Sequence, residues 1–568
     1  MEGYILGISC GYHDSAAALI KDGKVLGACE EERFTGIKHD SSFPINTIKW
    51  LYKEFKISGL DIEKVSFYDN PKYKLDRIEQ SLKRGPVTEF FNRKRILKRN
   101  KLKFEKFEKQ ISGITNTNIE IYYCDHHLSH AAYSFYTSPY DKASILSVDG
   151  VGEWETTTLY YGEGNQLAKI QQIKFPHSLG MLYSTFTAFL GFKPNEGEYK
   201  VMGLAPYGNP KRFLNKFRKL YNLTEDGGFE LNMEYFTFDW SDTHMFNERL
   251  GKLLGLPNRL PEDNLNQPHK DLAATLQYEY EFLFFRLVDR LFAVRASNNL
   301  CLSGGCAYNG TANGKILENT SFKNVWIPPA PSDAGSAIGA ALHVYYNTGG
   351  KNKPDNKSPY LGPHYTNGDV ESVLKEMDED VWYAKLPHSK LIPLMAQHIS
   401  NGNVVGWFEG KMEFGSRALG NRSILANPCD PQMKSRLNRV IKKREGFRPF
   451  APIVKVEEQS KYFDYSKEVP YMNQVVKVKE EYRDKLPAIT HVDDSARIQS
   501  LTRRQHNRMY DLLTELSKCN EYPIVINTSF NLKDQTMVLD PKSAIETFLN
   551  CEMDILVIHN YIIKKKIL

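Results

Sequence analysis

The first thirty residues place apolar positions in short blocks that have the length of β-strands. Residues 4–9 and 16–21 form two such blocks with a polar turn between them, and a third block covers residues 25–30. Asp22 and Gly23 separate the second block from the third, and this dipeptide is typical of the tight turn of a β-hairpin. The pattern therefore predicts a strand, a polar turn and an antiparallel hairpin.

The same order of blocks returns farther along the chain. Residues 143–148 are apolar, the turn at 149–152 is polar and rich in glycine, and two further strands are expected at 156–161 and 167–175. Both copies are followed by sequence with helical periodicity. The repeat predicts an internal duplication of an α/β fold, in the arrangement typical of actin-like nucleotide-binding proteins.

Glycine-rich turns mark the places where this predicted domain would hold a nucleotide. Main-chain N–H groups beside glycine can approach phosphate oxygens closely, because no Cβ atom stands in the way. A short strand at 300–303 runs into such a turn, and a loop precedes a helix of small residues that starts near Asp333. We expect the nucleotide to contact Gly150, Gly304, Gly305 and Asn309.

Residues 349–358 are polar and rich in turn-forming residues, which indicates a boundary between two domains. We therefore assign residues 1–355 to the duplicated domain and residues 356–568 to a second α/β domain. The second domain opens with a helix predicted at 370–377. Its strands are predicted at 404–408, 522–527 and 555–563.

Composition places the chain among globular proteins of a reducing compartment. Hydrophobic residues make up 41% and charged residues 25% of the 568 positions, and tyrosine and phenylalanine are abundant, which argues against disorder. The eight cysteines are scattered without a Cys-x-x-Cys pair, no apolar run approaches the ~20 residues of a membrane span, and no secretory leader opens the chain. We expect a cytoplasmic protein with free thiols and no membrane partner.

The net charge of +6 is small for this length and does not indicate a nucleic-acid partner. The basic residues are unevenly distributed, however, because residues 93–109 include nine of them among apolar positions at helical spacing. We interpret this segment as an amphipathic helix with a solvated polar face. A surface for an anionic acceptor or a membrane is the alternative interpretation.

Two histidines at helical spacing are the first sign of a metal site. His126 and His130 lie at positions i and i+4 of a predicted helix, so they project from the same face, as two ligands of one ion would. Asp149, after an apolar strand, and Asp333, before a helix, are candidate oxygen ligands. This mixed nitrogen and oxygen set suits Fe(II), Zn(II) or Mn(II). A hydrogen-bonded histidine pair at a helix start is the alternative.

The second domain has basic residues close to glycine and proline in an otherwise apolar setting. Arg417 and Arg422 stand in a loop flanked by glycine, and the run at 442–448 adds further cations. Arginine binds phosphate oxygens bidentately, and Asn or Ser groups at a strand end are neutral phosphate ligands. A polyphosphate site is therefore expected, with a surface basic loop and an ordinary turn as alternatives. Its expected members are Arg417, Arg422, Lys443, Arg444, Arg448, Asn527, Ser529 and Asn531.

Seven short motifs, taken in order, resemble one enzyme family over nearly the whole chain. They are Glu-Glu-Glu-Arg-Phe-Thr at 30–35, Asp-His-His-Leu-Ser-His-Ala at 125–131, Ser-Val-Asp-Gly at 147–150, Glu-Tyr-Lys-Val-Met-Gly-Leu-Ala-Pro-Tyr-Gly at 198–208, Ser-Gly-Gly-Cys-Ala-Tyr-Asn at 303–309, Pro-Ser-Asp-Ala-Gly at 331–335 and Glu-Phe-Gly-Ser-Arg-Ala-Leu-Gly-Asn-Arg-Ser-Ile-Leu at 413–425. The ordered set is similar to the O-carbamoyltransferases of nodulation factor, cephem and tobramycin tailoring, the NodU/CmcH type.

This resemblance implies a fold and a reaction for each domain. The first domain would be similar to the actin-like threonylcarbamoyl-transfer protein of tRNA modification. It would hold a metal, Fe(II) before Zn(II), Mn(II) or Mg(II), on the four residues His126, His130, Asp149 and Asp333. The second domain would be YrdC-like and would form carbamoyl-adenylate from ATP and carbamoyl phosphate, with Glu413 as a further member of its site.

The resemblance also implies that the carbamoyl group passes to a hydroxyl of a small molecule, as part of natural-product tailoring. Three residues are the expected catalytic contacts, namely His13, Asp14 and Lys38. The imidazole of His13 is interpreted either as the base that takes the hydroxyl proton or as a binding group for acceptor or phosphate.

Two other functions agree with parts of the sequence. A tRNA-modifying threonylcarbamoyl enzyme would explain the basic segment at 93–109. An actin-like sugar kinase would explain the duplicated hairpins, but not the pair of His126 and His130 or the second domain. The sequence does not identify the acceptor or the oligomeric state, for which a homodimer is one option.

Overall fold

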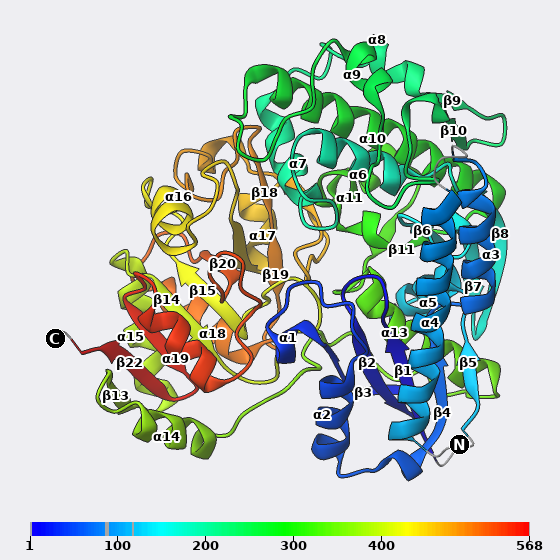
Figure 1. Cartoon of the computed structure of the whole chain (residues 1–568). Coiled ribbons are helices and arrows are strands. Elements are labelled where there is room, and N and C mark those ends of the chain that lie inside the picture. The colour runs from blue at the N-terminus through cyan, green and yellow to red at the C-terminus, as the bar shows by residue number, and fades with distance from the viewer. Residues whose placement is uncertain (1–2, 86–89, 116–118, 567–568) are drawn as a thin grey trace. The chain divides into compact units, whose positions relative to one another are not determined.

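The structure is a computed structural model that describes residues 3–85, 90–115 and 119–566, with the backbone alone at 90–93. The chain folds into two compact units (Figure 1). Unit 1 comprises Met1–Glu31 and Asp40–Lys357, and unit 2 comprises Glu32–His39 and Ser358–Leu568. The short segment Glu32–His39, which contains Lys38, therefore belongs to the second unit although it comes early in the sequence.

The first sheet of unit 1 is built on the amino-terminal hairpin. β1 (Tyr4–Ser9) pairs antiparallel with β2 (Ala16–Lys21), and β2 pairs antiparallel with β3 (Lys24–Glu30). On its other edge β1 pairs parallel with β4 (Ile62–Phe67), which pairs parallel with β5 (Ile121–Tyr123). The order β3-β2-β1-β4-β5 confirms the predicted strand, turn and hairpin.

The second sheet of unit 1 repeats this plan strand for strand. Its hairpin consists of β6 (Lys142–Val148), β7 (Glu155–Glu163) and β8 (Gln166–Lys174), all antiparallel. β6 then pairs parallel with β11 (Asn299–Ser303), and β11 with β12 (Asn324–Trp326). Taken from the hairpin edge, the order β8-β7-β6-β11-β12 matches that of the first sheet. The predicted internal duplication is therefore confirmed.

Two buried helices carry three of the four predicted metal ligands, and these helices approach each other closely. α5 (His126–Tyr136) and α13 (Asp333–Asn347) meet along small residues of α13. A Cβ atom built on Gly339 would lie 1.9 Å from the carbonyl oxygen of Ser129. Only glycine fits at this contact, because a methyl group there would force the helices apart. The other larger helices of unit 1 are α2 (Ile45–Phe55), α3 (Pro71–Leu82), α4 (Phe90–Ile114), α6 (Leu179–Phe189), α7 (Glu198–Leu204) and α10 (Gln267–Val294).

Unit 2 is a second α/β body around a mixed eight-stranded sheet of order β13-β22-β21-β14-β15-β20-β16-β19. These strands are β13 (Val381–Lys385), β14 (Val405–Phe408), β15 (Arg422–Ala426), β16 (Ala451–Lys455), β19 (Gln499–Leu501), β20 (Val525–Ser529), β21 (Ile555–Ile558) and β22 (Tyr561–Lys565). The helices include α14 (Asn367–Glu376), α15 (His388–Ser400), α17 (Val456–Tyr462), α18 (Asn507–Leu516) and α19 (Pro541–Leu549). Apolar clusters fill both faces of the sheet.

Two strand predictions in unit 2 are corrected by the structure. The single terminal strand predicted at 555–563 is wrong, because His559 adopts a left-handed backbone with φ 49° and the chain turns back into β22. The apolar residues on both sides hide this short turn from the hydrophobic pattern. The strand predicted at 522–527 starts and ends later, so that Asn527 and Ser529 lie within β20. Among the described residues, no helix is long and apolar enough to cross a membrane.

Candidate metal centre and phosphate site

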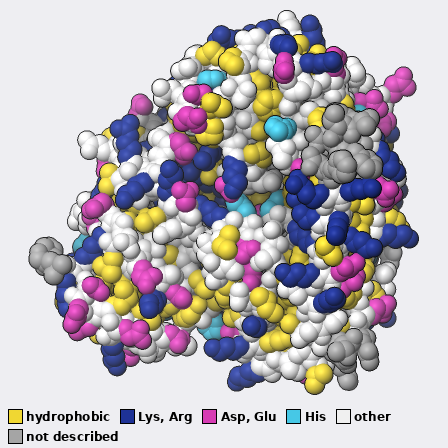
Figure 2. Space-filling model, in the orientation of Figure 1, with side chains coloured by type: hydrophobic (Ala, Val, Ile, Leu, Met, Phe, Trp, Pro, Cys, Tyr) yellow, Lys and Arg dark blue, Asp and Glu magenta, His cyan; other side chains and the backbone are white. Residues whose placement is uncertain are grey.

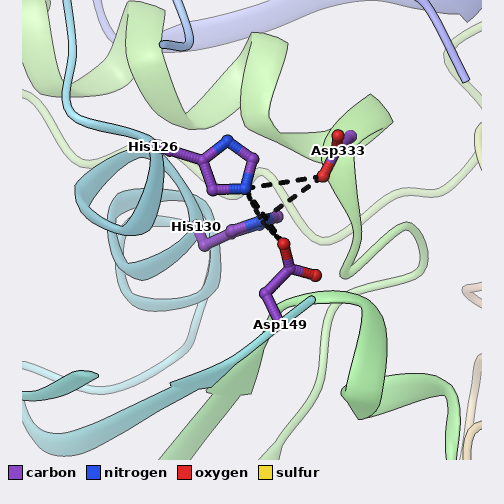
Figure 3. Close-up of side chains that lie close together, drawn as sticks. All are labelled: His126, His130, Asp149 and Asp333. Carbon is purple, nitrogen blue, oxygen red and sulfur yellow. Dashed lines mark hydrogen bonds and ion pairs between the residues drawn. The ribbon is translucent and has the colours of Figure 1, made fainter. Parts of the chain in front are cut away.

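Four side chains from separate parts of unit 1 meet at the start of α5 and α13 (Figure 3). His126 and His130 project from one face of α5, and their Nε2 atoms lie 3.1 Å apart. Asp149 Oδ2 lies 3.1 Å from Nε2 of His126, and Asp333 Oδ1 lies 3.6 Å from Nε2 of His130. One donor atom from each of the four lies within 4.8 Å of the others. The structure thus brings together all four residues that the sequence suggested as metal ligands.

The donor set fits a divalent cation on its own chemistry. All four side chains are buried, and Oδ1 of Asp333 has no hydrogen-bond partner among the described residues. An unpartnered buried carboxylate oxygen is costly unless a cation or a donor reaches it. Two imidazole nitrogens and two carboxylate oxygens are donors that suit Fe(II), Zn(II) or Mn(II).

The electrostatics of the cluster also favour a cation. Burial alone would lower the pKa of His126, but Asp333 and the hydrogen-bonded Asp149 outweigh it and raise this pKa to about 9. Burial likewise opposes ionisation of Asp149, yet the neighbouring histidines hold its pKa well below the usual range. The two carboxylates therefore create a negative potential in a buried site, which is the condition for binding a metal ion.

Surrounding groups fix the orientation of the four side chains. Ser336 Oγ lies 3.0 Å from Nδ1 of His130, and the main-chain N–H of Gly305 donates to Oδ1 of Asp149 at 2.7 Å. Glu153 accepts hydrogen bonds from the main-chain N–H of His126 at 3.0 Å. Outer contacts of this kind set the tautomer and the direction of metal ligands. No spacing in the sequence indicates a role for Glu153 or Ser336, because their role depends on tertiary contacts.

His127 points away from this cluster, in agreement with its exclusion from the ligand set. Its Nδ1 lies 2.8 Å from the hydroxyl of Thr158 on β7, and burial lowers its pKa well below the ordinary value. A neutral, hydrogen-bonded imidazole of this kind is a core residue.

The glycines assigned to a nucleotide lie around Asp149. Gly304 has φ 88°, and a Cβ atom there would lie 2.2 Å from the carbonyl oxygen of Val148, so the β11 turn needs glycine to reach β6. The carbonyl oxygen of Gly150 accepts a hydrogen bond from Ser178 at 2.7 Å. The amide of Asn309 exchanges two hydrogen bonds with Gln277, at 3.0 and 3.1 Å, and caps the following helix. A nucleotide contact from Gly150, Gly304, Gly305 and Asn309 stays a prediction.

His13 and Asp14 lie in the turn that follows β1. Nδ1 of His13 is 3.0 Å from Oδ2 of Asp14, whose φ of 50° marks a tight turn. Burial lowers the pKa of His13, but Asp333 and Asp14 outweigh it and raise this pKa to about 10. Because His13 lies near Asp333, it also lies beside the four predicted metal ligands. Lys38, in contrast, is exposed and belongs to unit 2.

A cluster of cations in unit 2 surrounds a buried lysine, Lys442, which starts the basic run at 442–448 but is not among the expected members of the phosphate site. The ammonium group of Lys442 contacts the side-chain oxygen of Asn531 at 2.7 Å and that of Ser529 at 3.3 Å. Burial, together with repulsion from Arg444 and Arg448, lowers its pKa well below the ordinary value. The neighbouring Lys443 is exposed, with φ 49°.

Arg497, which the sequence analysis missed, belongs to the same cluster. Burial and repulsion from Arg417, Arg444 and Arg448 hold the pKa of Arg497 well below that of a free guanidinium group. The hydrophobic pattern of a single helix or strand does not predict these contacts, because the residues come from separate loops and strands. Like charges held close together in a buried setting favour an anion of several charges.

Three other predicted members of the phosphate site, Glu413, Arg422 and Asn527, form hydrogen bonds with the main chain of the loop that contains Arg417. Glu413 is buried, and its Oε1 accepts hydrogen bonds from the main-chain N–H groups of Leu419, Asn421 and Arg422. The buried guanidinium of Arg422 donates to main-chain carbonyls, at 2.6 Å to Glu409, and lies 3.6 Å above the ring of Phe408. The amide of Asn527 donates to the carbonyl of Ala418 and to Gln499, each at 3.0 Å. These contacts position the loop that carries Arg417, and direct ligand contacts of the three stay a prediction.

Comparison with known sequences identifies the family of both units. Residues 4–342 match the family described as Carbamoyltransferase N-terminus, and residues 396–565 match Carbamoyltransferase C-terminus. Uncharacterized protein sll1178 from Synechocystis is 42% identical, over 99% of this chain and 97% of that protein. Nodulation protein NolNO from Sinorhizobium fredii is 34% identical, over 98% of this chain and 79% of that protein.

Two solved structures align with part of the chain at low sequence identity. HypF from T. kodakarensis aligns with a TM-score of 0.32 at 13% identity, covering 62% of this chain and 49% of that one. A ROK family glucokinase from Streptomyces griseus aligns with a TM-score of 0.27 at 12% identity, covering 60% of this chain and 99% of that one. With both sequence families matched along almost the whole chain, the protein belongs to the carbamoyltransferases and is an enzyme of carbamoyl transfer.

Proposed function

We propose that the enzyme is an ATP-dependent O-carbamoyltransferase that works in two half-reactions, one for each unit. The observation that carries this proposal is the division of charge between the units. Unit 1 holds a compact set of donors for one cation, whereas unit 2 holds a group of cations suited to a polyphosphate. A single chemical step would not require both kinds of site.

Unit 2 is assigned the activation step. Carbamoyl phosphate loses phosphate to water, and an oxygen of the resulting carbamate attacks the α-phosphorus of ATP, so that pyrophosphate leaves and carbamoyl-adenylate forms. Arg444, Arg448 and Arg497 neutralise the phosphate oxygens, which also reduces the repulsion that, after burial, lowers the pKa of Arg497. Lys442, held by Ser529 and Asn531, donates hydrogen bonds to the phosphate oxygens.

Unit 1 is assigned the transfer step. The acceptor oxygen attacks the carbamoyl carbon, and AMP leaves with the electrons of the broken bond. His13 orients the acceptor hydroxyl, and the released proton goes to His13 when its imidazole is neutral and otherwise to water. A divalent cation held by His126, His130, Asp149 and Asp333 would supply Lewis acidity toward the carbamoyl carbonyl or bind the AMP phosphate.

The acceptor is proposed to be a small hydroxyl compound such as a sugar, an antibiotic or another natural product. Support comes from the relatives that bear the name of nodulation proteins and match along most of the chain. A tRNA acceptor and a sugar kinase reaction are the competing functions.

One experiment separates these functions before the acceptor is known. The full-length protein is incubated with ATP, carbamoyl phosphate and a divalent metal, and pyrophosphate, AMP and ADP are measured. We expect pyrophosphate that depends on carbamoyl phosphate. Formation of ADP in place of pyrophosphate would overturn the adenylate mechanism and favour a kinase. Binding of tRNA that does not require carbamoyl phosphate and that weakens steeply with added salt would favour RNA modification.

A further inference from the structure

The positive charge of this protein is concentrated on one helix of unit 1. Residues 93–109 contain nine basic and two acidic residues, so this segment alone carries more net charge than the +6 of the whole chain. The remainder of the molecule is therefore close to neutral. Figure 2 shows the Lys and Arg side chains gathered over α3 and α4. A charge that merely kept the protein in solution would not need to be confined to one element.

α4 (Phe90–Ile114) is fixed to the protein by its apolar side. Ile96, Phe104, Phe107 and Ile111 are buried, the last three in the core cluster under the first sheet. Lys103 also turns inward, where its ammonium group donates to the carbonyl of Gly11 in the turn that carries His13. The helix cannot roll to expose its apolar side, so the side with its exposed cations stays toward solvent.

The outward face of α4, which we call the basic face, carries five exposed cations with no ion pair to any other described residue, and the exposed carboxylate of Glu105 lies among them. The five cations are Arg95, Lys98, Lys101, Lys106 and Lys109. Arg99 beside them pairs with Asp242 at 3.2 Å. The basic face extends for roughly 22 Å along the helix axis. Leu102 lies in the middle of this row, one turn from Lys98 and from Lys106, and 53% of it is exposed.

We propose that the basic face docks on the surface of a bilayer that contains anionic phospholipids. Unpaired cations on an amphipathic helix are attracted to such a surface, and an exposed leucine between them can enter the headgroup boundary. The row is longer than a single small anion, so it fits an extended anionic surface. The described aromatic residues of α4, Phe104 and Phe107, are buried and cannot stack on bases, which disfavours a single-stranded nucleic acid.

This inference departs from the solvated helix and the absence of a membrane partner that the sequence suggested. The sequence could not show that all of these cations lack partners or that Leu102 lies among them. It stands independently of the carbamoyl-transfer mechanism, since none of the residues of the basic face belongs to either candidate site. It concerns attachment to a surface and involves no membrane-spanning segment.

The test is co-sedimentation of the full-length protein with sucrose-loaded vesicles at low salt. Vesicles of phosphatidylcholine and phosphatidylglycerol in equal parts should bind the protein, vesicles of phosphatidylcholine alone should not, and added salt should release it. The triple variant Lys98→Gln, Lys101→Gln, Lys106→Gln should bind roughly a hundredfold more weakly, at about fivefold for each charge. Leu102→Gln should weaken binding by a few-fold.

A matched control removes the same charge elsewhere on unit 1. The triple variant Lys24→Gln, Lys49→Gln, Lys53→Gln changes exposed lysines away from α4 and should bind like the parent protein. All variants should share the parent's thermal midpoint, because the changed side chains are exposed. No binding to anionic vesicles, or equal binding by both triple variants, would overturn the proposal. Binding to a short RNA duplex without vesicle binding, lost only in the α4 variant, would assign the basic face to nucleic acid instead.

Discussion

His126 in unit 1 and His559 in unit 2 have pKa values shifted in opposite directions, and the contrast shows how the charges around each differ. In unit 1 the carboxylates around His126 raise its pKa to about 9 despite burial. In unit 2 burial and the nearby Arg422 and Arg508 lower the pKa of His559 to about 4. Besides burial, the groups that act most on His126 are carboxylates and those that act most on His559 are guanidinium groups. The carboxylates of the unit 1 cluster and the like-charged arginines around Arg497 each favour a ligand of the opposite sign.

The largest effect is expected when one predicted metal ligand is removed from unit 1 and unit 2 is left unchanged. His130→Ala should weaken metal binding by at least about a hundredfold, because removing a ligand costs more than removing an outer contact. Pyrophosphate release by unit 2 should remain close to the parent value. Metal content after gel filtration and pyrophosphate formation measure the two effects. His127→Gln, on the same helix, is the control that should keep the metal, and loss of both activities in a folded His130→Ala protein would contradict the division of labour.

Removing the buried cation of unit 2 tests the opposite side of the comparison. Lys442→Met should reduce pyrophosphate release by about a hundredfold, since a charged contact to the transferring phosphates is lost. Stability should change by no more than about 1 kcal/mol, because an apolar side chain also relieves the repulsion from Arg444 and Arg448. Chemical denaturation and the pyrophosphate assay measure these quantities.

The matched control for that variant is Lys542→Met, which changes an exposed lysine of the same unit. It should leave both quantities unchanged. A large loss of stability in Lys442→Met would mean that the lysine is a structural part of the core, and a normal pyrophosphate rate would remove it from the site.

The close contact between α5 and α13 can be tested in the same way as the charges of unit 1. Gly339→Ala places a methyl group against the carbonyl of Ser129, so α13 should shift away from α5 and separate Asp333 from His130. We expect a loss of about 3 kcal/mol in the free energy of unfolding and weaker metal binding. Denaturant titration and metal titration check both. Gly113→Ala, on the exposed side of α4 with no atom within 4 Å of the new methyl group, should instead stabilise by up to about 1 kcal/mol.

The last test concerns the acid sensitivity of unit 2. The folded pKa of His559 is lowered from 6.5 to about 4, so the unfolded chain binds the extra proton first as the pH falls. The contribution of His559 to stability is therefore present above about pH 6.5, and it declines by up to about 3 kcal/mol toward about pH 4. His559→Asn, which tolerates the left-handed backbone, should lose less stability over that window. If the free energy of unfolding of the parent protein and of His559→Asn falls by the same amount between about pH 6.5 and about pH 4, groups other than His559 determine the acid sensitivity.

Local sequence patterns were sufficient for the parts of the fold that repeat a simple period. The two hairpins, the duplication and the His126/His130 spacing follow from rules of a few residues, and ordered motifs pointed to Asp149 and Asp333. Arg497 and Glu153 could not be found in this way, because their roles arise from contacts between distant segments. Lys442 starts the basic run at 442–448 that the sequence indicates, but its burial could not be predicted. The turn at His559 was missed because two apolar strands joined by two residues have the same pattern as one long strand.

The early segment Glu32–His39 has a consequence for the order in which the protein can be completed. Arg33 donates from its buried guanidinium to the carbonyl of Gly415 at 3.0 Å, across 382 residues of chain. During synthesis this segment emerges among the first and must wait for another 382 residues before its partner exists. The second unit is therefore finished last and cannot be obtained intact by cutting the chain at its linker. Point variants, rather than truncated domains, are the way to isolate its chemistry.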